Sequence, residues 1–395
     1  MSVIKDSEKI DSLLTRGVVE VIDTDNLKQK LLVGKQLRIK LGIDPTSPNL
    51  HIGRSIPILK LKDFQELGHQ IVFIVGDFTG TIGDTSDKES ERPALSSEEI
   101  EKNMETYIEQ VSKIIDINKT EVRYNSEWLD KIGYKEICKQ ADLFSLSEFI
   151  ARKNSKRRLE KKTRISLREL MYPLMQGYDS VAVKADVELG GTDQRFNLLA
   201  GREMQSFYGQ EPQDIMTNTL IEGLDGRKMS SSWGNVINFL DPPQEMFGKV
   251  MSMSDGMIIP YFENCTRVPI TEVKEYEKQL KDNKECNPRD IKMQLAYEIT
   301  KIYWGDDNAK EAKEHFISVV QNKDLPEDIP QKEISEMNIV DALVESGLVE
   351  SKSDARRLIS QGGVTVNSER VASLDDMVNK DDIIKKGKRF FVKAV

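Results

Sequence analysis

Residues that could bind a phosphate or another anion gather in a stretch with strand, turn and helix character. Leu37–Arg54 reads LRIKLGIDPTSPNLHIGR, an extended run followed by a turn of Asp, Pro, Ser and Asn and then by His51-Ile52-Gly53. Glycine lets a ligand approach the main chain, and the free N–H groups at the start of a helix favour negative charge. An ordinary strand-to-helix turn has a similar composition, so the meaning of this stretch depends on the rest of the chain.

Three later loops also carry charged side chains beside glycines. In open parallel sheets, loops at the carboxyl ends of strands form the ligand crevice. In Glu222–Asn235, positive charge with neighbouring hydroxyl groups suits an anion, whereas Gly76–Arg92 alone also fits a solvated surface loop. The loops are Gly76–Arg92 with Asp84, Lys88 and Arg92, Asp186–Gln194 with Asp193 and Gln194 after a Gly-Gly turn, and Glu222–Asn235 with Arg227, Lys228 and three serines.

Another candidate site is a helix face in the segment RELMYPLMQGYDS. Tyr172, Gln176 and Asp179 stand at positions i, i+4 and i+7, which places a phenol, an amide and a carboxylate on one face. In a mostly apolar segment such a face can recognise a small polar ligand. A helix with a partly wet side is the alternative.

Positive charge is dense between Arg152 and Arg168. A block of this kind is often a solvated helix face. In a chain of net charge −9 it is equally a candidate for phosphate contacts. The basic residues are Arg152, Lys153, Lys156, Arg157, Arg158, Lys161, Lys162, Arg164 and Arg168.

The elements expected around these residues alternate between helix and strand. Strand–helix–strand is the unit of a parallel sheet, so the chain predicts an α/β fold with a Rossmann-like parallel sheet. A helical region is expected from Asp241, a linker over Asn322–Lys332, and a helix pair with short strands at the C-terminus. The N-terminal half predicts helices over residues 1 to about 36, Ser55–Leu67 and Ser97–Ile115, and strands over Gln70–Val75, Glu121–Tyr124 and the start of Asp186–Gln194.

Composition excludes several classes of protein. The 395 residues are enough for two or three domains. No apolar run approaches the roughly 20 residues of a membrane span, and the charged N-terminus does not resemble a signal peptide, so we expect a cytoplasmic protein. Three scattered cysteines and three histidines predict neither a disulfide framework nor a metal site.

Taken together, these motifs resemble the class I aminoacyl-tRNA synthetases, and most closely the bacterial tyrosyl-tRNA synthetases. His51-Ile52-Gly53-Arg54 resembles the family's HIGH signature, and Lys228-Met-Ser-Ser-Ser232 resembles its KMSKS loop. Tyr172-x3-Gln176-x-Tyr178-Asp179 is similar to the tyrosine-binding helix of the family. GGTDQ at Gly190–Gln194 and the spacing of Asp84, Lys88 and Arg92 also fit.

The resemblance implies a two-step reaction. Tyrosine and ATP, with Mg²⁺ accompanying the ATP, would give tyrosyl-adenylate and pyrophosphate, and the tyrosyl group would then move to the 3′ end of tRNA(Tyr). The catalytic residues implied are His51, Thr46, Lys228, Lys88 and Arg92. The ATP-binding residues implied are Gly42, Asp44, His51, Arg54, Gly191, Asp193, Lys228 and Ser231. The tyrosine-binding residues implied are Asp84, Tyr172, Gln176, Asp179, Gln194 and Lys40.

The resemblance also implies a domain plan, RNA contacts and a homodimer. A catalytic domain would cover 1–225, with a connective insertion at about 125–185. A helical anticodon-binding region would cover 226–321, a linker 322–332, and an RNA-binding domain similar to a ribosomal small-subunit protein 333–395. The RNA-binding residues expected are Arg152, Lys153, Arg157, Arg158, Arg356, Arg357, Lys388 and Arg389.

Three positions depart from the family's commonest pattern. Arg54 replaces the second His of HIGH, and Ser231 replaces the second Lys of KMSKS. Lys40 stands where many members place a tyrosine against the substrate's hydroxyl. These departures motivate one alternative, a non-catalytic RNA-binding paralogue. The other alternative is a related synthetase such as the tryptophanyl enzyme.

Overall fold

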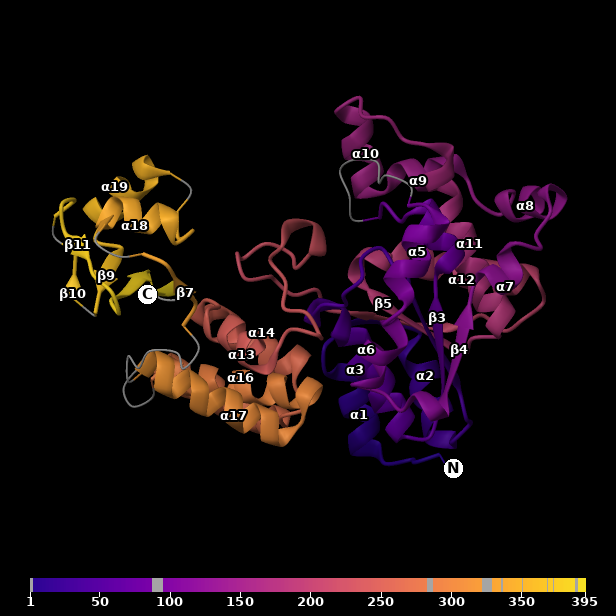
Figure 1. Cartoon of the computed structure of the whole chain (residues 1–395). Helices are drawn as coiled ribbons and strands as arrows, with labels where there is room; N and C mark the ends of the chain where they lie inside the picture. Colours follow the sequence, from indigo (N-terminus) through magenta and orange to yellow (C-terminus); the bar gives the residue numbers. More distant parts are fainter. Residues whose placement is uncertain are drawn as a thin grey trace. The chain divides into compact units, whose positions relative to one another are not determined.

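The computed structural model describes residues 3–86, 95–282, 287–321, 329–334, 337–349, 351–367, 369–371, 373–387 and 390–395. The chain forms two compact units, Met1–His315 and Phe316–Val395 (Figure 1). Among the described residues, no helix combines the length and the apolar composition that crossing a membrane requires.

The first unit is built on a six-stranded sheet with the order β1-β6-β5-β2-β3-β4. Neighbouring strands from β6 to β4 pair in parallel, whereas β1 pairs with β6 antiparallel at the edge. The predicted α/β fold with a parallel sheet is therefore confirmed. The strands are β1 (Val18–Ile22), β2 (Arg38–Ile43), β3 (Gln70–Val75), β4 (Thr120–Tyr124), β5 (Val187–Gly191) and β6 (Asp214–Asn218).

The N-terminal region differs from the helical prediction for residues 1–36. Helices α1 (Ser7–Thr15) and α2 (Thr24–Val33) form, but Val18–Ile22 between them is the edge strand β1. Its residues are β-branched apart from Glu20, and pairing with β6 supplies the backbone partners that a local pattern does not reveal. The helix α3 (Ile52–Glu66) follows the first motif and packs against β2, β3 and β5.

Two segments after β3 also correct the sequence-based prediction. The loop expected from Gly76 begins as the short helix α4 (Asp77–Ile82), whose first N–H groups are capped by the side-chain oxygen of Asn125. A cap supplied by a residue so distant in the chain leaves no local signal. The single helix expected over Ser97–Ile115 is two helices, α5 (Ser97–Met104) and α6 (Tyr107–Ser112).

The connective region and the helices that follow complete the first unit. Helix α11 carries the polar face and packs against α12 and against β2, and α12 packs against β5 and β6. The helices are α7 (Ser126–Leu129), α8 (Tyr134–Ala141), α9 (Leu146–Ala151), α10 (Lys153–Glu160), α11 (Leu167–Val183), α12 (Arg195–Phe207), α13 (Pro243–Met251), α14 (Ile258–Cys265), α15 (Ile270–Asp282), α16 (Pro288–Trp304) and α17 (Asp306–Phe316).

The second unit has its own core beneath the expected helix pair. Helices α18 (Ile339–Glu345) and α19 (Lys352–Ser360) bury Ile339, Leu343 and Ile359 with strand residues such as Val364 and Ile384. The main sheet has the order β10-β9-β12-β13-β7, and β11 pairs with β8. The strands are β7 (Gln331–Lys332), β8 (Met337–Asn338), β9 (Val364–Val366), β10 (Glu369–Arg370), β11 (Met377–Val378), β12 (Ile383–Lys386) and β13 (Phe390–Ala394).

Candidate active site

A cavity of about 500 Å³ opens at the carboxyl ends of β2, β3 and β5. In open α/β sheets this is where ligands bind, beside the point at which the strand order reverses. Chain segments from residue 41 to residue 232 line the cavity, so the structure brings the separate motifs together. The predicted residues that line it are Gly42, Asp44, Thr46, His51, Arg54, Asp84, Tyr172, Gln176, Asp179, Gly191, Asp193, Gln194, Lys228 and Ser231.

Gly42 gives the cavity an open backbone surface. It is the exposed residue of β2, and a Cβ built there would have only Ile74 nearby, at 4.0 Å. A side chain at this position would project into the space beside the strand. The absence of a side chain therefore leaves room for a flat ligand group to lie on the main chain.

His51 is fixed by the chain segment that follows the Lys228 loop. The N–H of Ile52 donates to the carbonyl of Ile237 at 2.9 Å, and the N–H of Phe239 donates to the carbonyl of Leu50 at 2.9 Å. A Cβ on Gly53 would lie 3.0 Å from His51 Nδ1, so glycine permits the close packing of the ring. These contacts join the first motif to residues about 185 positions later.

The imidazole of His51 is uncharged near neutral pH. Burial, together with the nearby charges of Arg54 and Lys228, lowers the pKa of His51 to about 3. Its Nδ1 atom is buried and has no hydrogen-bond partner in the structure. A neutral ring with an unsatisfied nitrogen can exchange a hydrogen bond with a ligand oxygen without titrating between pH 6 and 8.

Lys228 reaches across the cavity to Asp193. The Lys228 Nζ atom lies 2.8 Å from Asp193 Oδ2. The next residue, Met229, packs its sulfur against the backbone nitrogen of Gly53 at 3.3 Å. The loop that resembles KMSKS is therefore held over the His51 motif, and its lysine is paired with the Asp193 carboxylate.

The polar face of α11 points into the same cavity. The Tyr172 hydroxyl donates to Asp44 Oδ2 at 2.8 Å, which links the two groups of residues assigned to tyrosine and to ATP. Burial raises the pKa of Asp44 to about 6, although hydrogen bonds from Thr79 and Tyr172 oppose this shift. Nearby, Gln194 Nε2 donates to Asp84 Oδ2 at 2.7 Å.

Asp179 is held by two residues to which the sequence reasoning gave no role. Trp128 Nε1 donates to Asp179 Oδ1 at 2.8 Å, and Asn125 Nδ2 lies 3.3 Å from Asp179 Oδ2. Burial raises the pKa of Asp179 to about 7, against the opposing effects of the Lys40 charge and of these two hydrogen bonds. The position of Asn125 directly after β4, at the carboxyl edge of the sheet, is the signal that could have found it.

Lys40 does not lie where the resemblance places it. It is fully buried and is not among the residues that line the cavity. Its ammonium group bonds Glu188 Oε1 at 2.9 Å, the carbonyl of Gln176 at 2.9 Å and Ser180 Oγ at 2.8 Å. Because an ammonium group has three hydrogens, none remains for a ligand. The assignment of Lys40 as a direct tyrosine contact is therefore wrong.

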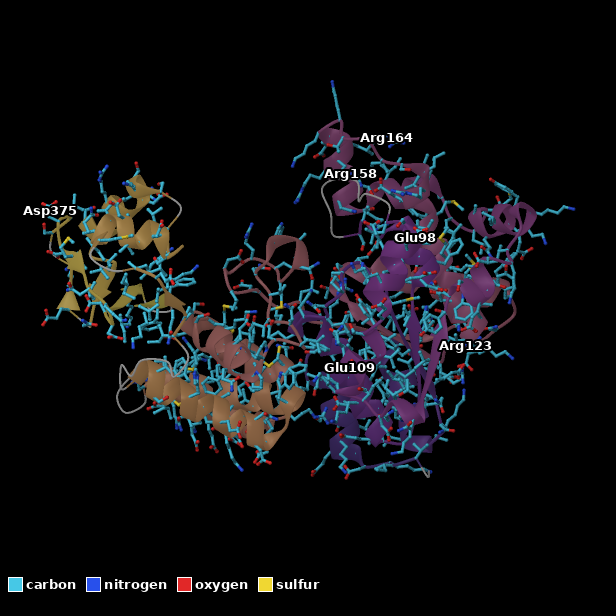
Figure 2. All side chains as sticks on the ribbon, viewed as in Figure 1. Glu98, Glu109, Arg123, Arg158, Arg164 and Asp375 are labelled. Carbon is cyan, nitrogen blue, oxygen red and sulfur yellow. The ribbon has the colours of Figure 1, made fainter. Side chains whose placement is uncertain are left out.

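Arg158 also fails its assigned role as an RNA contact. Its side chain is buried, pairs with both oxygens of the buried Glu169 and donates to the carbonyl of Arg164. Figure 2 labels Arg158 and Arg164 in the same part of the first unit. Both Arg158 and its neighbour Arg157 belong to the same dense run of basic residues, so the sequence does not reveal that Arg157 is exposed and Arg158 is buried. Arg152, half-buried, stacks its guanidinium over the Phe196 ring, with 4.7 Å to the ring centroid.

Replacing Arg158 with alanine should destabilise the first unit rather than act on RNA alone. Removing one partner leaves Glu169 buried without its countercharge, which typically costs about 3–5 kcal/mol. Urea unfolding of the Arg158→Ala variant should therefore show a lower free energy of unfolding than the parent. Unchanged stability combined with weaker tRNA binding would restore the original assignment.

The other predicted residues are either exposed or lie outside the part of the chain that the structure describes. In the second unit, Arg356 is exposed, and the exposed Arg357 pairs with Asp354 at 2.7 Å. The predicted positions Lys88, Arg92, Lys388 and Arg389 lie outside the described residues, as does the side chain of Lys153. Within the described ranges, no cluster of three or more His, Cys, Asp or Glu side chains is arranged to hold a metal ion.

Comparison with known families accounts for both units of the chain. Residues 33–321 match the family model of the class I tRNA synthetases (W and Y), and residues 321–393 match the model of a tyrosine–tRNA ligase SYY-like C-terminal domain.

Relatives of known name match over nearly the full length. A tyrosine–tRNA ligase of Thermotoga maritima is 48% identical over 383 residues, covering 96% of this chain and 95% of the relative. A tyrosine–tRNA ligase 2 of Clostridium acetobutylicum is 45% identical over 390 residues, covering 97% of each.

Solved structures agree in fold. A tyrosyl-tRNA synthetase from Archaeoglobus fulgidus, complexed with L-tyrosine, has a TM-score of 0.62 at 22% identity and covers 78% of this chain and 100% of its own. A similar fold brings the same strand ends together, and the two family models extend the match to the second unit. The chain belongs to the class I tRNA synthetase family of the W and Y type, and within it to the tyrosine–tRNA ligases.

Proposed function

We propose that the protein is an ATP-dependent tyrosine–tRNA ligase that works through the cavity at the strand ends. The observation that carries this proposal is the convergence of the His51 motif, the Lys228 loop and the polar face of α11 on that single space. The full-length similarity to tyrosine–tRNA ligases supports the same substrates. We also propose a cytoplasmic location, which the bacterial relatives that match over nearly the full length support.

The first step joins the two small substrates. The carboxylate oxygen of tyrosine attacks the α-phosphorus of ATP, a new C–O–P link forms, and the bond to the β-phosphate bridging oxygen breaks with release of pyrophosphate. The nucleophile is already ionised, so no protein base is required to activate it. The protein's contribution is to position the reactants and to stabilise the negative charge that develops on the phosphates.

Phosphate stabilisation falls to residues at the mouth of the cavity. Neutral His51 and Thr46 supply hydrogen bonds, and Arg54 and Lys228 supply positive charge. Arg54 in place of a second histidine keeps a donor that can bind two phosphate oxygens at once. Ser231 lies in the same loop as Lys228, with 3.5 Å between its Oγ atom and that of Ser47. It places a hydroxyl where the KMSKS pattern has a charged lysine. We assign pyrophosphate contacts also to Lys88 and Arg92.

We assign the nucleoside of ATP to the part of the cavity that is lined by Gly42, Gly191 and Asp193. Gly42 and Gly191 leave the backbone open to the ribose and base, and Asp193 accepts from the ribose hydroxyls. In this arrangement ATP must displace the Lys228 ammonium from Asp193, which frees the lysine for the phosphates. Mg²⁺ arrives with ATP, since it binds mainly through phosphate oxygens and water.

The tyrosine side of the cavity provides acceptors for the ammonium group and the phenol of the amino acid and a donor for its carboxylate. Asp84, Tyr172 and the Gln176 amide oxygen surround the ammonium group. The Gln176 amide nitrogen is held by Glu188 at 3.2 Å, which leaves its oxygen to accept. Gln194 lies near the carboxylate. Asp179 accepts the hydrogen bond of the phenol, and a phenylalanine substrate would leave this buried carboxylate one hydrogen bond short. The discrimination of tyrosine from phenylalanine by this enzyme class is the standard example of that rule.

The second step requires contacts with tRNA(Tyr). We assign these to exposed basic residues of the insertion and of the second unit, among them Arg157 and Arg356. For the domain plan we keep a catalytic domain over 1–225 with its insertion and a helical region over 226–321. The RNA-binding domain also takes in β7 (Gln331–Lys332) from the expected linker, because β7 pairs with β13. Residues 322–328 of that linker lie outside the described residues. We also propose a homodimer, supported by large exposed apolar side chains along the insertion, among them Tyr134 and Leu167.

Removal of the second unit should separate the two steps. Strand β7 pairs with β13, so a cut after residue 332 would take a strand from the C-terminal sheet. A chain ending at residue 321 avoids this. It should form tyrosyl-adenylate as the full chain does, yet charge tRNA more slowly. Parallel assays of pyrophosphate exchange and of tRNA charging measure both, and an equal loss in the two would show that the second unit is needed for folding.

Pyrophosphate exchange without tRNA tests the proposed function itself. Exchange that depends on tyrosine and ATP is the expected result. The absence of exchange with any amino acid would favour the RNA-binding paralogue, and exchange with tryptophan would favour the related synthetase.

A further inference from the structure

Beneath the cavity lies a buried ion pair that the reaction does not use directly. Lys40 on β2 and Glu188 on β5 are 0% and 1% exposed, with 2.9 Å between Lys40 Nζ and Glu188 Oε1. Glu188 also accepts hydrogen bonds from Ser180, Gln176 and Gln213. Burying two charges offsets much of their attraction, so stability alone does not account for such a pair.

The pair is joined to the turn of α11 that carries Asp179. Lys40 Nζ bonds the carbonyl of Gln176 and the hydroxyl of Ser180, three residues before and one residue after Asp179. Ser180 Oγ in turn donates to Glu188 Oε2 at 3.0 Å. Lys40 on β2 and Glu188 on β5 thus both bond the helical turn that carries Asp179, and a displacement of either strand would move the Asp179 carboxylate.

The charges around Asp179 come from each element packed against it. Lys40 on β2 is positive and Glu188 on β5 is negative. Trp128 and Asn125 at α7 donate hydrogen bonds, and Tyr172 lies on α11 itself. Among the groups that act on the Asp179 carboxyl, Lys40 opposes the effect of burial most strongly, whereas Glu188 adds to it. Lys40 therefore lowers the pKa of the Asp179 carboxyl, and Glu188 raises it.

We propose that the Lys40–Glu188 pair is a positioning element for tyrosine selection: it fixes the Asp179 turn through Gln176 and Ser180, and it places one positive and one negative charge beside the carboxylate that accepts the substrate's phenol. Lys40 thereby serves the phenol without touching it. This inference rests on the role proposed above for Asp179.

The test is the pH profile of kcat/KM for tyrosine in pyrophosphate exchange, which reports ionisations of the free enzyme. In the parent protein kcat/KM should fall below a midpoint near the Asp179 pKa of about 7. A protonated carboxyl carries no negative charge and therefore accepts the phenol's hydrogen bond more weakly than a carboxylate does. Lys40→Met should move this midpoint up and Glu188→Gln should move it down, each by roughly one pH unit. The double variant should return close to the parent.

Two controls make the profile specific. Lys60→Met removes another buried lysine, whose Nζ lies 3.2 Å from Asp63 and which does not line the cavity, and it should leave the midpoint unchanged. Asp179→Asn should abolish the acidic limb with its midpoint near pH 7, whereas the Asp44 carboxyl of the same cavity, whose pKa burial raises to about 6, titrates at lower pH. If the limb persists in Asp179→Asn, the role of Asp179 and this inference both fail.

If Asp179→Asn removes the limb but the two single variants do not shift it in opposite directions, this inference alone is overturned. A purely structural role for the pair would lower kcat/KM at every pH without moving the midpoint. Should Lys40→Met not fold, Glu188→Gln and the double variant still decide the outcome, since the pair model predicts a downward shift for the first and a near-parent midpoint for the second.

Discussion

Replacing Asp179 with alanine should lower kcat/KM for tyrosine by roughly 10- to 100-fold, the range expected when a hydrogen bond to a charged acceptor is lost. The loss arises because the phenol would enter a buried space with no partner for its hydroxyl. The KM for ATP should stay unchanged, since the nucleotide lies against other residues of the cavity. Steady-state pyrophosphate exchange, with each substrate varied in turn, measures both constants.

Discrimination is the sharper readout for Asp179. The ratio of kcat/KM for tyrosine to that for phenylalanine should fall in the alanine variant, because the buried carboxylate that loses a hydrogen bond when phenylalanine binds is gone. Trp128→Phe, which removes a single donor to Asp179, should have a smaller effect in the same direction. Equal losses in tyrosine and ATP use would refute the assigned role.

Replacing Lys228 with alanine should slow adenylate formation by about 10²–10³-fold, the usual loss when one group that stabilises transition-state charge is removed. The effect should appear in kcat, with the KM for tyrosine unchanged, since the lysine acts on the phosphates. Single-turnover measurement of adenylate formation separates this step from product release.

Arg227 provides a matched control for Lys228. It is the preceding residue and also a cation, but it pairs with Asp225, stacks over Trp233 with 4.7 Å to the ring centroid, and does not line the cavity. Arg227→Ala should therefore change the rate far less than Lys228→Ala. Similar losses in both variants would mean that the loop's overall charge, not the position of Lys228, stabilises the phosphates.

Short-range patterns were sufficient for the motifs and for the parallel strands β2, β3, β4 and β5, but they did not reveal the parallel strand β6 (Asp214–Asn218). Buried β-branched runs followed by glycine loops predicted which strand ends meet, and spacing along α11 placed Tyr172, Gln176 and Asp179 on one face of the helix that lines the cavity. These features depend on periodicity and on turn residues within a few positions of one another.

Features set by distant partners could not be predicted in this way. The helix α4 depends on capping by Asn125, and β1 depends on pairing with β6. Lys40 and Arg158 look like free cations in the sequence, yet each is neutralised by an acid that only the fold brings near, Glu188 and Glu169 respectively. Local sequence gives the charge of a side chain but not its burial, and burial decided both corrections.

The claim that this cavity selects tyrosine for activation is tested most directly by pyrophosphate exchange with each of the twenty amino acids in the absence of tRNA. The structure predicts exchange with tyrosine in the parent protein, and a preference for tyrosine over phenylalanine that narrows in Asp179→Ala. No tyrosine-dependent exchange, or an unchanged preference in the variant, would contradict it.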